Sequence, residues 1–455
     1  MAESEKDREA NRFSARMGRY AKVGTNVGGI AAKMAGARLF GVSLNKDKNA
    51  SDLTAALGNL KGPVMKVAQL LSTIPDAIPP EYAEELASLQ SNAPPMGWGF
   101  VKRRMNAELG AGWQKKFAEF DKEPAAAASL GQVHKAKALG GEALACKLQY
   151  PDMDSAVEAD LQQLGMLFSI HRRMKPAIDT TDIANEISDR VREELDYERE
   201  AAHMALYRQI FSDEKTVRVP DIVPELSTRR LLTMNWLDGG GLLQFKDRPL
   251  EERNRIATAM FKAWWHPFSH VGIIHGDPHL GNYTVFENSG EASGINLLDY
   301  GCIRIFPSSF VQGVVDLYQG MRTDNREQTV AAYERWGFRG LTNELIDVLN
   351  IWAKFIYGPL LEDRVRSLAD GVSPAAYGRK EAFRVHQALK EKGPVRVPRE
   401  FVFMDRAAIG LGGVFLHLKA EMNFFKLFNE QIDGFQEEKV ANRQAKLLED
   451  VNLVQ

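Results

Sequence analysis

Apolar residues in the first quarter of the chain recur at helical spacing. Between residues 52 and 109 they return every three or four positions, which places them on one face of a helix. Proline pairs at 79–80 and 94–95 interrupt the pattern, because proline is tolerated at the start of a helix but not inside it. The stretch is therefore predicted to form successive helices, the second over 81–90 and the third over 98–109.

The pattern changes after residue 121, where short apolar segments replace the helical spacing. Residues 129–136 and 143–149 are separated by Leu139-Gly140-Gly141, a turn signal typical of a β-hairpin. Strands are therefore predicted to begin here. The pattern also predicts a long helix over 153–209, short extended segments at 217–224 and 230–236, and a mostly helical remainder from residue 242 onward.

Composition excludes several classes of protein. Of 455 residues, 44% are hydrophobic and 26% are charged, as in an ordinary globular chain. The 58 basic and 60 acidic residues give a net charge of −2, so no nucleic-acid partner is expected, and two cysteines exclude a disulfide framework and a cysteine zinc site. The charged N-terminus lacks the apolar stretch of a secretory signal, and no apolar run of about 18 residues occurs. We therefore expect a cytoplasmic protein without a transmembrane segment.

One charged segment stands apart from this balance. Residues 12–41 carry six basic residues and no acidic residue, mixed with glycine, alanine and a few large apolar residues. Such an arm could lie on an anionic membrane surface, which would give the protein a peripheral membrane contact. Such stretches are more often solvated arms, and the sequence leaves both interpretations open.

One polar constellation points to phosphoryl transfer. Asp277 and Asn282 lie in the sequence His-Gly-Asp-Pro-His-Leu-Gly-Asn, and Asp299 opens an Asp-Tyr-Gly triplet. The first spacing matches the kinase pattern His-x-Asp-x-x-x-x-Asn, and the triplet is a conservative form of Asp-Phe-Gly. Transfer from ATP needs a carboxylate that orients the acceptor, together with an amide oxygen and a second carboxylate that hold Mg²⁺. The three residues supply these groups in that order.

A second interpretation treats the same loop as a metal site or a purely structural loop. His275, Asp277 and His279 could bind a transition metal, or they could satisfy nearby backbone groups. This interpretation leaves Asn282 and the Asp-Tyr-Gly triplet without a role. Kinase-type chemistry is therefore favoured.

The upstream residues provide what an ATP-binding small lobe requires. Lys147 stands among apolar residues of a predicted strand, where a kinase lysine holds the α and β phosphates. A helical carboxylate is expected to pair with it, and an ideal helix would place Glu193, Asp196 and Glu200 on one face. Glu194 would lie well round from that face, so spacing alone does not choose the partner. Small residues before the lysine would let backbone N–H groups approach phosphate, namely Ala126, Ala127, Ala128 and Ser129.

These residues resemble the UbiB/AarF (ADCK-type) family of atypical protein-kinase-like ATPases, and the resemblance runs from about residue 57 to 423. Ala68 replaces the usual glycine of the family's Lys-x-Gly-Gln motif, while Lys66 and Gln69 are retained. Three features outside the common kinase motifs carry the resemblance. They are the Lys-x-Gly-Gln-like extension at 62–72 with Pro79-Pro80-Glu81-Tyr82, the alanine-rich loop at 125–128, and Glu-Leu-Asp-Tyr-Glu-Arg-Glu-Ala at 194–201.

The resemblance implies an α+β, atypical protein-kinase-like two-lobe fold with a helical N-terminal extension covering the active site. We expect a basic arm at 1–51, a helical extension with the Lys-x-Ala-Gln motif at 52–120, a kinase-like N-lobe with a helical insert at 121–236, and a helical C-lobe at 237–455. The implied site roles are an ion pair between Lys147 and Glu200, a catalytic position for Asp277, Mg²⁺ ligation by Asn282 and Asp299, nucleotide contact by residues 126–129 and Lys147, and an adenine hinge at Met234 and Trp236.

The covering helix poses a geometric question. The resemblance implies that Lys66 and Gln69 face Glu194 and Asp196 across the site. One regular helix cannot direct both acids to the same side. Either the helix is distorted at this point or only one acid takes part.

The function implied by the resemblance is that of an ATP-binding, Mg²⁺-dependent atypical kinase or ATPase that supports ubiquinone (coenzyme Q) biosynthesis. The implied partners are a nucleotide, an isoprenoid or phenolic lipid and coenzyme Q biosynthesis proteins. Two alternatives stay open. A small-molecule phosphotransferase of the aminoglycoside or choline kinase type shares His-Gly-Asp-x-x-x-x-Asn, and a nucleotide-sensing scaffold would need the same nucleotide site without turnover.

Overall fold

The structure of the protein is a computed structural model. The predicted basic arm and residues 52–95 of the predicted helical extension, with Lys66 and Gln69, lie outside the residues that it describes, as do Ala128 and Ser129. The described residues are 96–127, 130–151, 188–369 and 400–453, with a few positions between these ranges.

The chain divides into two compact units, which are described separately. Of the described residues, the first unit contains those of 96–161, 188–198 and 223–236. The second unit contains those of 199–222 and 237–453.

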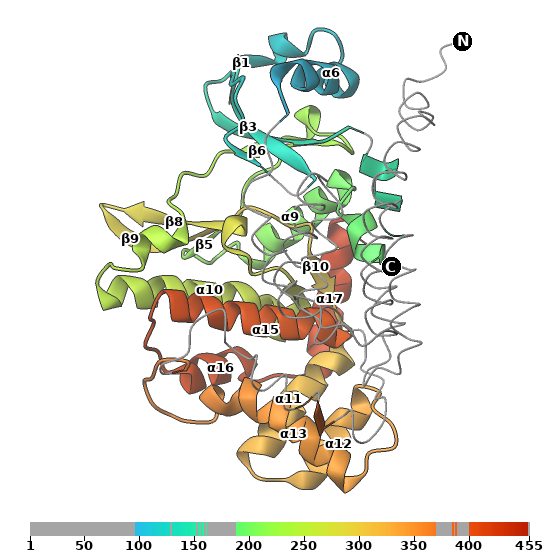
Figure 1. Cartoon of the computed structure of the whole chain (residues 1–455), viewed down its shortest axis with the longest axis vertical. Coiled ribbons are helices and arrows are strands. Elements are labelled where there is room, and N and C mark those ends of the chain that lie inside the picture. Colours follow the sequence, from blue (N-terminus) through green and yellow to red (C-terminus); the bar gives the residue numbers. More distant parts are fainter. Residues whose placement is uncertain are drawn as a thin grey trace, which may run out of the picture. The chain divides into compact units, whose positions relative to one another are not determined.

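A five-stranded antiparallel sheet is the framework of the first unit (Figure 1). β4 lies between β3 and β6, so both of its edges are paired and all of its residues except Ala143 and Lys147 are buried. This central position explains why the strand is nearly all apolar in sequence. The strands are β1 (Phe117–Phe120), β2 (Ala126–Ala127), β3 (Gly131–Ala138), β4 (Ala143–Gln149) and β6 (Leu231–Asn235).

Helix α6 (Trp98–Leu109) is tied to the end of this sheet by a buried arginine. Arg104 donates from Nε to the carbonyl oxygen of Gln149 at 3.1 Å and from Nη2 to that of Tyr150 at 3.3 Å. The two carbonyl groups belong to the last residue of β4 and to the residue that follows it. The predicted helix over 98–109 and the predicted hairpin of 129–136 and 143–149 are confirmed, although the first strand of the hairpin begins at Gly131 and ends at Ala138.

The helix predicted over 153–209 is not continuous. A helical segment ends at Glu193, and a separate helix, α9 (Tyr197–Ile210), begins four residues later. The first segment ends in two hydrogen bonds between residues three positions apart. The Leu195 N–H donates to the Arg192 carbonyl, and the Asp196 N–H donates to the Glu193 carbonyl. The acids at 194–196 therefore lie in a turn, and the shared face expected from an ideal helix does not exist.

Two small sheets form the strand part of the second unit. The sequence analysis predicted no hairpin at 283–297, but β8 and β9 form one through Ser289 and Gly290, both of which have positive φ. Such a two-residue turn matches the twist of the strands, and Asn-Ser-Gly was its signal in the sequence. The strands are β5 (Val217–Arg218), β8 (Tyr283–Asn288) and β9 (Glu291–Leu297) in one sheet, and β7 (Ile273–His275) and β10 (Ile303–Ile305) in the other.

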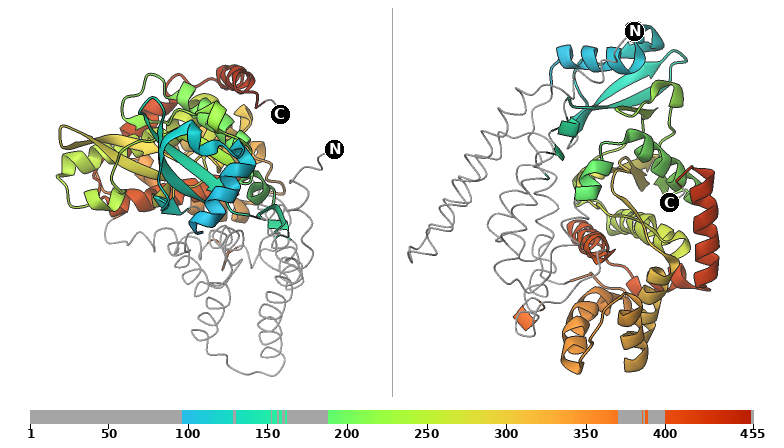
Figure 2. Two further views of the ribbon diagram at one scale, coloured as in Figure 1. Left: turned by 90° about the horizontal axis from the view of Figure 1, so that it is seen from above. Right: turned by 90° about the vertical axis from the view of Figure 1, so that its right-hand side faces the viewer.

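Helices make up the rest of the second unit, as predicted. The central α10 (Leu250–Val271) buries one face, with Trp264 fully inaccessible, and ends at Gly272, whose φ of 70° suits glycine. The C-terminal α17 (Glu437–Asp450) packs against α10 and α11 (Ser308–Arg322) (Figure 2). The other described helices are α11 (Ser308–Arg322), α12 (Arg326–Arg335), α13 (Asn343–Tyr357), α15 (Glu400–His417), α16 (Phe424–Ile432) and α17 (Glu437–Asp450).

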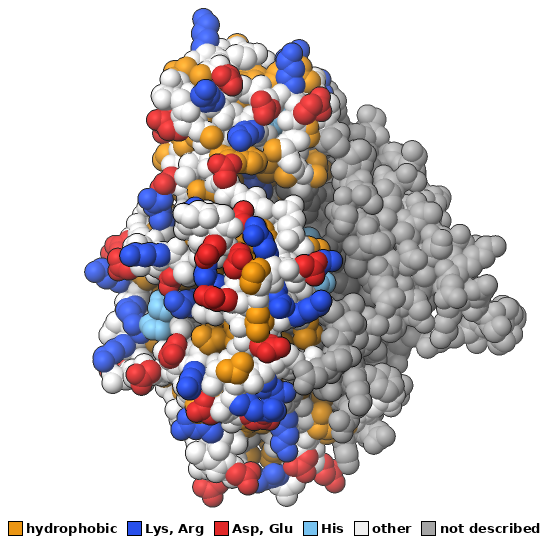
Figure 3. All heavy atoms as spheres, turned by 90° about the vertical axis from the view of Figure 1, so that its left-hand side faces the viewer, with side chains coloured by type: hydrophobic (Ala, Val, Ile, Leu, Met, Phe, Trp, Pro, Cys, Tyr) orange, Lys and Arg blue, Asp and Glu red, His pale blue; other side chains and the backbone are white. Residues whose placement is uncertain are grey.

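The surface mixes charges of both signs. On the face drawn in Figure 3, basic and acidic side chains alternate over the described residues. Among the helices that the structure describes, none combines the length and the apolar character needed to cross a membrane.

Two histidines on α10 make stability depend on pH. The rings of His266 and His270 lie 4.0 Å apart between centroids, and burial lowers the pKa of His270 to about 4, helped by His266 and Arg443. Glu214 and Lys262 also act on this pair. Because the folded state resists protonation, this stability is complete above the ordinary pKa of 6.5 and is lost as the pH falls toward 4.

We predict that the unfolding free energy falls by roughly 2 kcal/mol from pH 7 to pH 5 because of His270. The variant His270→Gln should lack most of this decrease. Urea unfolding at both pH values measures it. His279→Gln, at an exposed position, is the matched control. An equal pH dependence for the His270 variant and the unmutated protein would contradict the prediction.

Candidate active site

The kinase-type residues of the second unit lie on two adjoining segments. β7 and β10 pair antiparallel, with His275 opposite Ile303, so the loop after β7 and the turn before β10 leave the same end of the pair. The Gly276 N–H donates to the Cys302 carbonyl at 2.7 Å, and the Leu298 N–H donates to the Asn282 carbonyl at 2.9 Å. Residues widely separated in sequence are thereby brought together on a backbone scaffold.

His275 joins these segments through both ring nitrogens. It is completely buried; Nδ1 accepts from the Asp277 N–H at 3.1 Å, and Nε2 lies 2.8 Å from the Asp299 carbonyl oxygen. The network assigns a neutral ring that donates through Nε2. His279 is exposed, and its Nδ1 accepts from the Gly281 N–H. Both histidines therefore serve the loop backbone, and the transition-metal interpretation gains no support; the described residues contain no cluster of metal-ligand type.

Asp277 forms a buried ion pair with Arg406 of α15. Arg406 Nη2 donates to Asp277 Oδ1 at 2.8 Å, and the two side chains are only 6% and 5% exposed. Sequence analysis did not identify Arg406 as a site residue. Its only signal was a charge at the start of a long apolar run, and it stands 129 positions from its partner.

Two further contacts of α15 hold Arg406 in place. A Cβ on Gly410 would lie 2.3 Å from Pro278 Cγ, so the helix approaches the loop too closely for a larger residue. Asp405 Oδ1 accepts from Trp352 Nε1 of α13 at 3.1 Å, and burial raises the pKa of that carboxyl to about 7. The guanidinium therefore reaches Asp277 from a helix that is anchored on both sides.

Asn282 and Asp299 offer oxygen atoms beside this loop. Asn282 is half-buried in the short turn Leu280–Asn282, and its Nδ2 donates to the Asp277 carbonyl at 3.0 Å. This contact uses the amide nitrogen, whereas Mg²⁺ prefers the amide oxygen. Asp299 is also half-buried, and its Oδ1 accepts from the Gly301 N–H at 3.3 Å.

Tyr300 anchors the Asp-Tyr-Gly triplet in the core of the second unit. Its N–H donates to Glu200 Oε1 at 3.4 Å, and its carbonyl oxygen lies 3.1 Å from His203 Nδ1 of the same helix, α9. Burial raises the pKa of the Tyr300 phenol well above its usual range, so the ring is a neutral packing group. Glu200 is 3% exposed. Its predicted pairing with Lys147, which belongs to the first unit, stays a prediction.

The first unit holds the predicted nucleotide residues. Lys147 is half-buried on β4, and its Nζ lies 5.2 Å from the ring centroid of Tyr197. Ala126 and Ala127 form β2, which pairs with Val133 and Gln132 of β3. The strand is exposed and lies shortly before β3 in sequence, which is the position expected for the alanine-rich loop of the nucleotide site.

The predicted hinge residues end the last strand of this sheet. Met234 is buried opposite Ala145, and the half-buried Trp236 donates its N–H to the Ala143 carbonyl at 2.8 Å. Lys135 Nζ lies 4.7 Å from the Trp236 ring centroid.

The predicted gating acids occupy the turn before α9. Glu194 and Asp196 are both half-buried, and Asp196 Oδ1 accepts from the Glu198 N–H at 3.1 Å, which caps the helix. Glu193 pairs with Arg190 at 2.5 Å. One regular helix could not direct Glu194 and Asp196 to the same side, but the helix is broken here, so that objection no longer applies. Their predicted partners, Lys66 and Gln69, lie outside the described residues.

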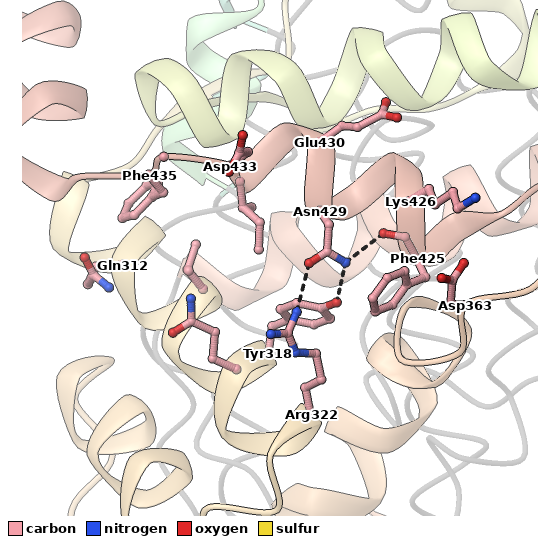
Figure 4. Close-up of a pocket in the computed structure, with 14 residues that line it drawn as sticks. Gln312, Tyr318, Arg322, Asp363, Phe425, Lys426, Asn429, Glu430, Asp433 and Phe435 are labelled. Atoms are coloured by element: carbon pink, nitrogen blue, oxygen red, sulfur yellow. Dashed lines mark hydrogen bonds between the residues drawn. The ribbon is translucent and has the colours of Figure 1, made fainter.

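A pocket of about 740 Å³ lies elsewhere in the second unit, between α11 and α16 (Figure 4). Asn429 donates to the Tyr318 hydroxyl at 2.6 Å and accepts from Arg322 at 3.1 Å on its wall. Two basic and three acidic residues line it, and none of the kinase-type residues does; the charged residues are Arg322, Lys426, Asp363, Glu430 and Asp433.

Comparisons with known proteins agree with this geometry. The ABC1 atypical kinase-like domain matches residues 88–333. The mitochondrial atypical kinase COQ8 of Saccharomyces cerevisiae is 31% identical over 268 residues, which are 58% of this chain and 52% of that protein. AarF domain-containing protein kinase 1 of Xenopus laevis is 31% identical over 283 residues, 61% of this chain and 54% of that protein. The chain thus spans about half the length of these curated relatives.

A solved structure extends the similarity to the fold. The complex of Rv3197 with erythromycin from Mycobacterium tuberculosis superposes with a TM-score of 0.59 at 26% identity, covering 88% of this chain and 98% of that chain. A mixed helix-and-sheet fold with these motifs defines an atypical kinase-like protein. The chain belongs to the ABC1 atypical kinase-like family, also called UbiB/AarF.

The Arg406–Asp277 pair generates a prediction about stability. Arg406→Met leaves a buried carboxylate without its cation, so we expect a loss of about 3–5 kcal/mol in unfolding free energy. Arg406→Met combined with Asp277→Asn should lose less than the sum of the two single changes. Urea unfolding of the four proteins measures the coupling.

Arg253 provides the matched control. Its Nη1 binds the carbonyl oxygens of Leu418 and Lys419 beyond α15, at 2.7 and 2.9 Å, and no carboxylate of the loop. Arg253→Met should therefore be additive with Asp277→Asn. If the Arg406 cycle were additive as well, the ion pair would contribute no coupling, contrary to the prediction.

Proposed function

We propose that this protein is an ATP-binding, Mg²⁺-dependent atypical kinase or ATPase that supports isoprenoid-lipid metabolism, with ubiquinone biosynthesis as the setting. The observation that carries the proposal is that His275 joins the backbone of Asp277 to that of Asp299, while the Asn282 amide donates to the Asp277 carbonyl. Family membership supports the same chemistry at a coarser level.

The donor set of the second unit suits Mg²⁺. Asn282 and Asp299 offer one amide and one carboxylate oxygen, both from half-buried positions, and hard oxygen donors are what this ion prefers. These two residues would hold the ion. When bound, it supplies positive charge that bridges and neutralises the phosphates.

Asp277 would receive the hydrogen bond of the attacking hydroxyl or water. Its Oδ1 is held by Arg406, and its N–H is held by His275. The carboxylate is therefore oriented before an acceptor arrives, which is how a preorganised group contributes to transfer.

Residues of the first unit would bind the nucleotide. Lys147 would attract the α and β phosphates, and the small residues 126–129 would let backbone N–H groups approach them. Met234 and Trp236 would face the adenine. Lys66 and Gln69 would close the site with Glu194 and Asp196, and Glu200 would pair with Lys147, as the family resemblance implies.

The substrate setting rests on relatives. One relative is named atypical kinase COQ8 and is mitochondrial, and the solved structural neighbour is a complex with erythromycin. An isoprenoid or phenolic lipid is our proposed ligand for this chain. Anionic membrane, reached through the basic arm, and coenzyme Q biosynthesis proteins are proposed as further partners.

The metal role of Asp299 generates a prediction. Asp299→Asn should weaken Mg²⁺-dependent ATP binding about tenfold or more, because a neutral amide replaces a charged ligand. Thermal-shift titration with ATP at several Mg²⁺ concentrations measures it. Asp363→Asn changes an exposed carboxylate remote in sequence and should leave binding unaltered. An unchanged shift for the Asp299 variant would remove the residue from this role.

A phosphate-release assay, combined with the ATP-binding titration, distinguishes the function itself. We expect phosphate release from MgATP that increases with quinone-like phenols or anionic liposomes. Binding without any release would favour a nucleotide-sensing scaffold. Transfer to an aminoglycoside or choline would favour a small-molecule phosphotransferase.

Lys147 generates a further prediction. Lys147→Ala should weaken ATP binding or turnover about tenfold, because the charge-assisted contact with phosphate is lost. Lys135→Ala removes a lysine of the neighbouring strand that also lies over an aromatic ring, and it should have little effect. Equal losses in the two variants would count against a special role for Lys147.

A further inference from the structure

The ammonium group of Lys147 lies over an aromatic face within its own unit. Its Nζ is 5.2 Å from the centroid of the Tyr197 ring, and Tyr197 is 2% exposed. A cation within about 6 Å of a ring face is attracted by the negative face of the π system, and the attraction strengthens when water is excluded. Tyr197 belongs to the acidic sequence at 194–201, where sequence analysis considered only the carboxylates.

Two backbone contacts fix the position of Tyr197. Its N–H donates to the Arg229 carbonyl at 3.2 Å. The buried Gln149 donates from Nε2 to the Leu195 carbonyl at 3.1 Å. Gln149 stands two positions after Lys147 on β4, so both side chains leave the same face of the strand. The turn that carries the ring is therefore tied to the strand that carries the lysine.

Gly131 leaves the space that the ring occupies. A Cβ at this first residue of β3 would lie 2.9 Å from the Tyr197 hydroxyl and 2.2 Å from the Leu148 carbonyl oxygen. Any larger residue would displace the ring or the strand. The ring thus sits between the strand that follows the alanine-rich loop and the lysine of the next strand.

We propose that Tyr197 is a positioning residue that holds the Lys147 ammonium for phosphate. A neutral ring attracts the cation without neutralising it, whereas a carboxylate partner cancels part of its charge. The ring therefore orders the side chain in addition to the carboxylate pairing proposed above, without further reducing its positive charge. The significance for nucleotide binding rests on the proposed function, but the contact can be tested without a nucleotide.

The first readout is the NMR spectrum of the protein after reductive methylation with ¹³C-formaldehyde. Aromatic rings shift the methyl signals of a lysine above their face to high field. We expect high-field dimethyl-lysine signals for Lys147 and Lys135, assigned with Lys147→Arg and Lys135→Arg. Tyr197→Phe should keep the Lys147 shift, and Tyr197→Met should remove it. The Lys135 signal should stay in place in both variants, because its ring belongs to Trp236.

The second readout is ATP affinity of the unmethylated proteins. Tyr197→Phe keeps the ring and should bind ATP within about twofold of the unmutated protein, whereas Tyr197→Met should bind about three- to tenfold more weakly. Rescue by Phe separates a ring effect from the loss of the buried hydroxyl. Circular dichroism and thermal unfolding establish that each variant is folded.

The outcomes that overturn the proposal are distinct from a failure of the proposed function. A Lys147 signal at the ordinary position in the unmutated protein overturns it without any Tyr197 variant, and so does a Lys147 shift that survives Tyr197→Met. Equal weakening of ATP binding by Phe and Met would make Tyr197 a merely structural residue. If the unmutated protein bound no ATP, the proposed function would fall, and the spectrum would still decide whether the ring holds the lysine.

Discussion

The ion pair between Arg406 and Asp277 sets the geometry of the second unit around the loop that follows β7. A carboxylate that is 5% exposed cannot stay charged in a protein without compensation, and the guanidinium of α15 provides it at 2.8 Å. The pair requires α15 to approach the loop closely, which Gly410 permits beside Pro278. A charge requirement at one residue of the loop therefore determines where an 18-residue helix lies.

Backbone groups complete what the ion pair begins. Both ring nitrogens of His275 form hydrogen bonds with the backbone of Asp277 and Asp299. The backbone of Tyr300 contacts Glu200 and His203 of α9 and so attaches the Asp-Tyr-Gly segment to that helix. None of these contacts uses the side-chain oxygen of Asn282, which is the atom that would bind Mg²⁺ in a kinase reaction. The scaffold is thus built from histidine, tyrosine and main-chain groups, and the oxygen donors at its edge can serve a ligand.

The sequence predicted elements and local motifs well, and long-range charge pairing poorly. β4 and α6 follow from periodicity, because a central strand must be apolar and an amphipathic helix must repeat every three or four residues. The candidate triad follows from spacing, because its chemistry is local. Arg406 could not be found in this way, since no periodic pattern links residues 129 positions apart. The break at 194–196 was only one of two alternatives left open by the sequence, because charged residues tolerate both helix and turn.

The two units hold their charged groups in different ways, and the difference follows from what each group would have to do. Asp277 is paired with a full positive charge, which fixes it and limits its freedom to rotate. Lys147 is half-buried over the face of the Tyr197 ring, and this contact orders its ammonium group without replacing the pairing with Glu200 that we propose. A group that must present a constant geometry to a small acceptor benefits from the first arrangement. A group that must attract a highly charged phosphate chain benefits from the second, because the ring restricts the lysine side chain and does not itself repel phosphate as a carboxylate would.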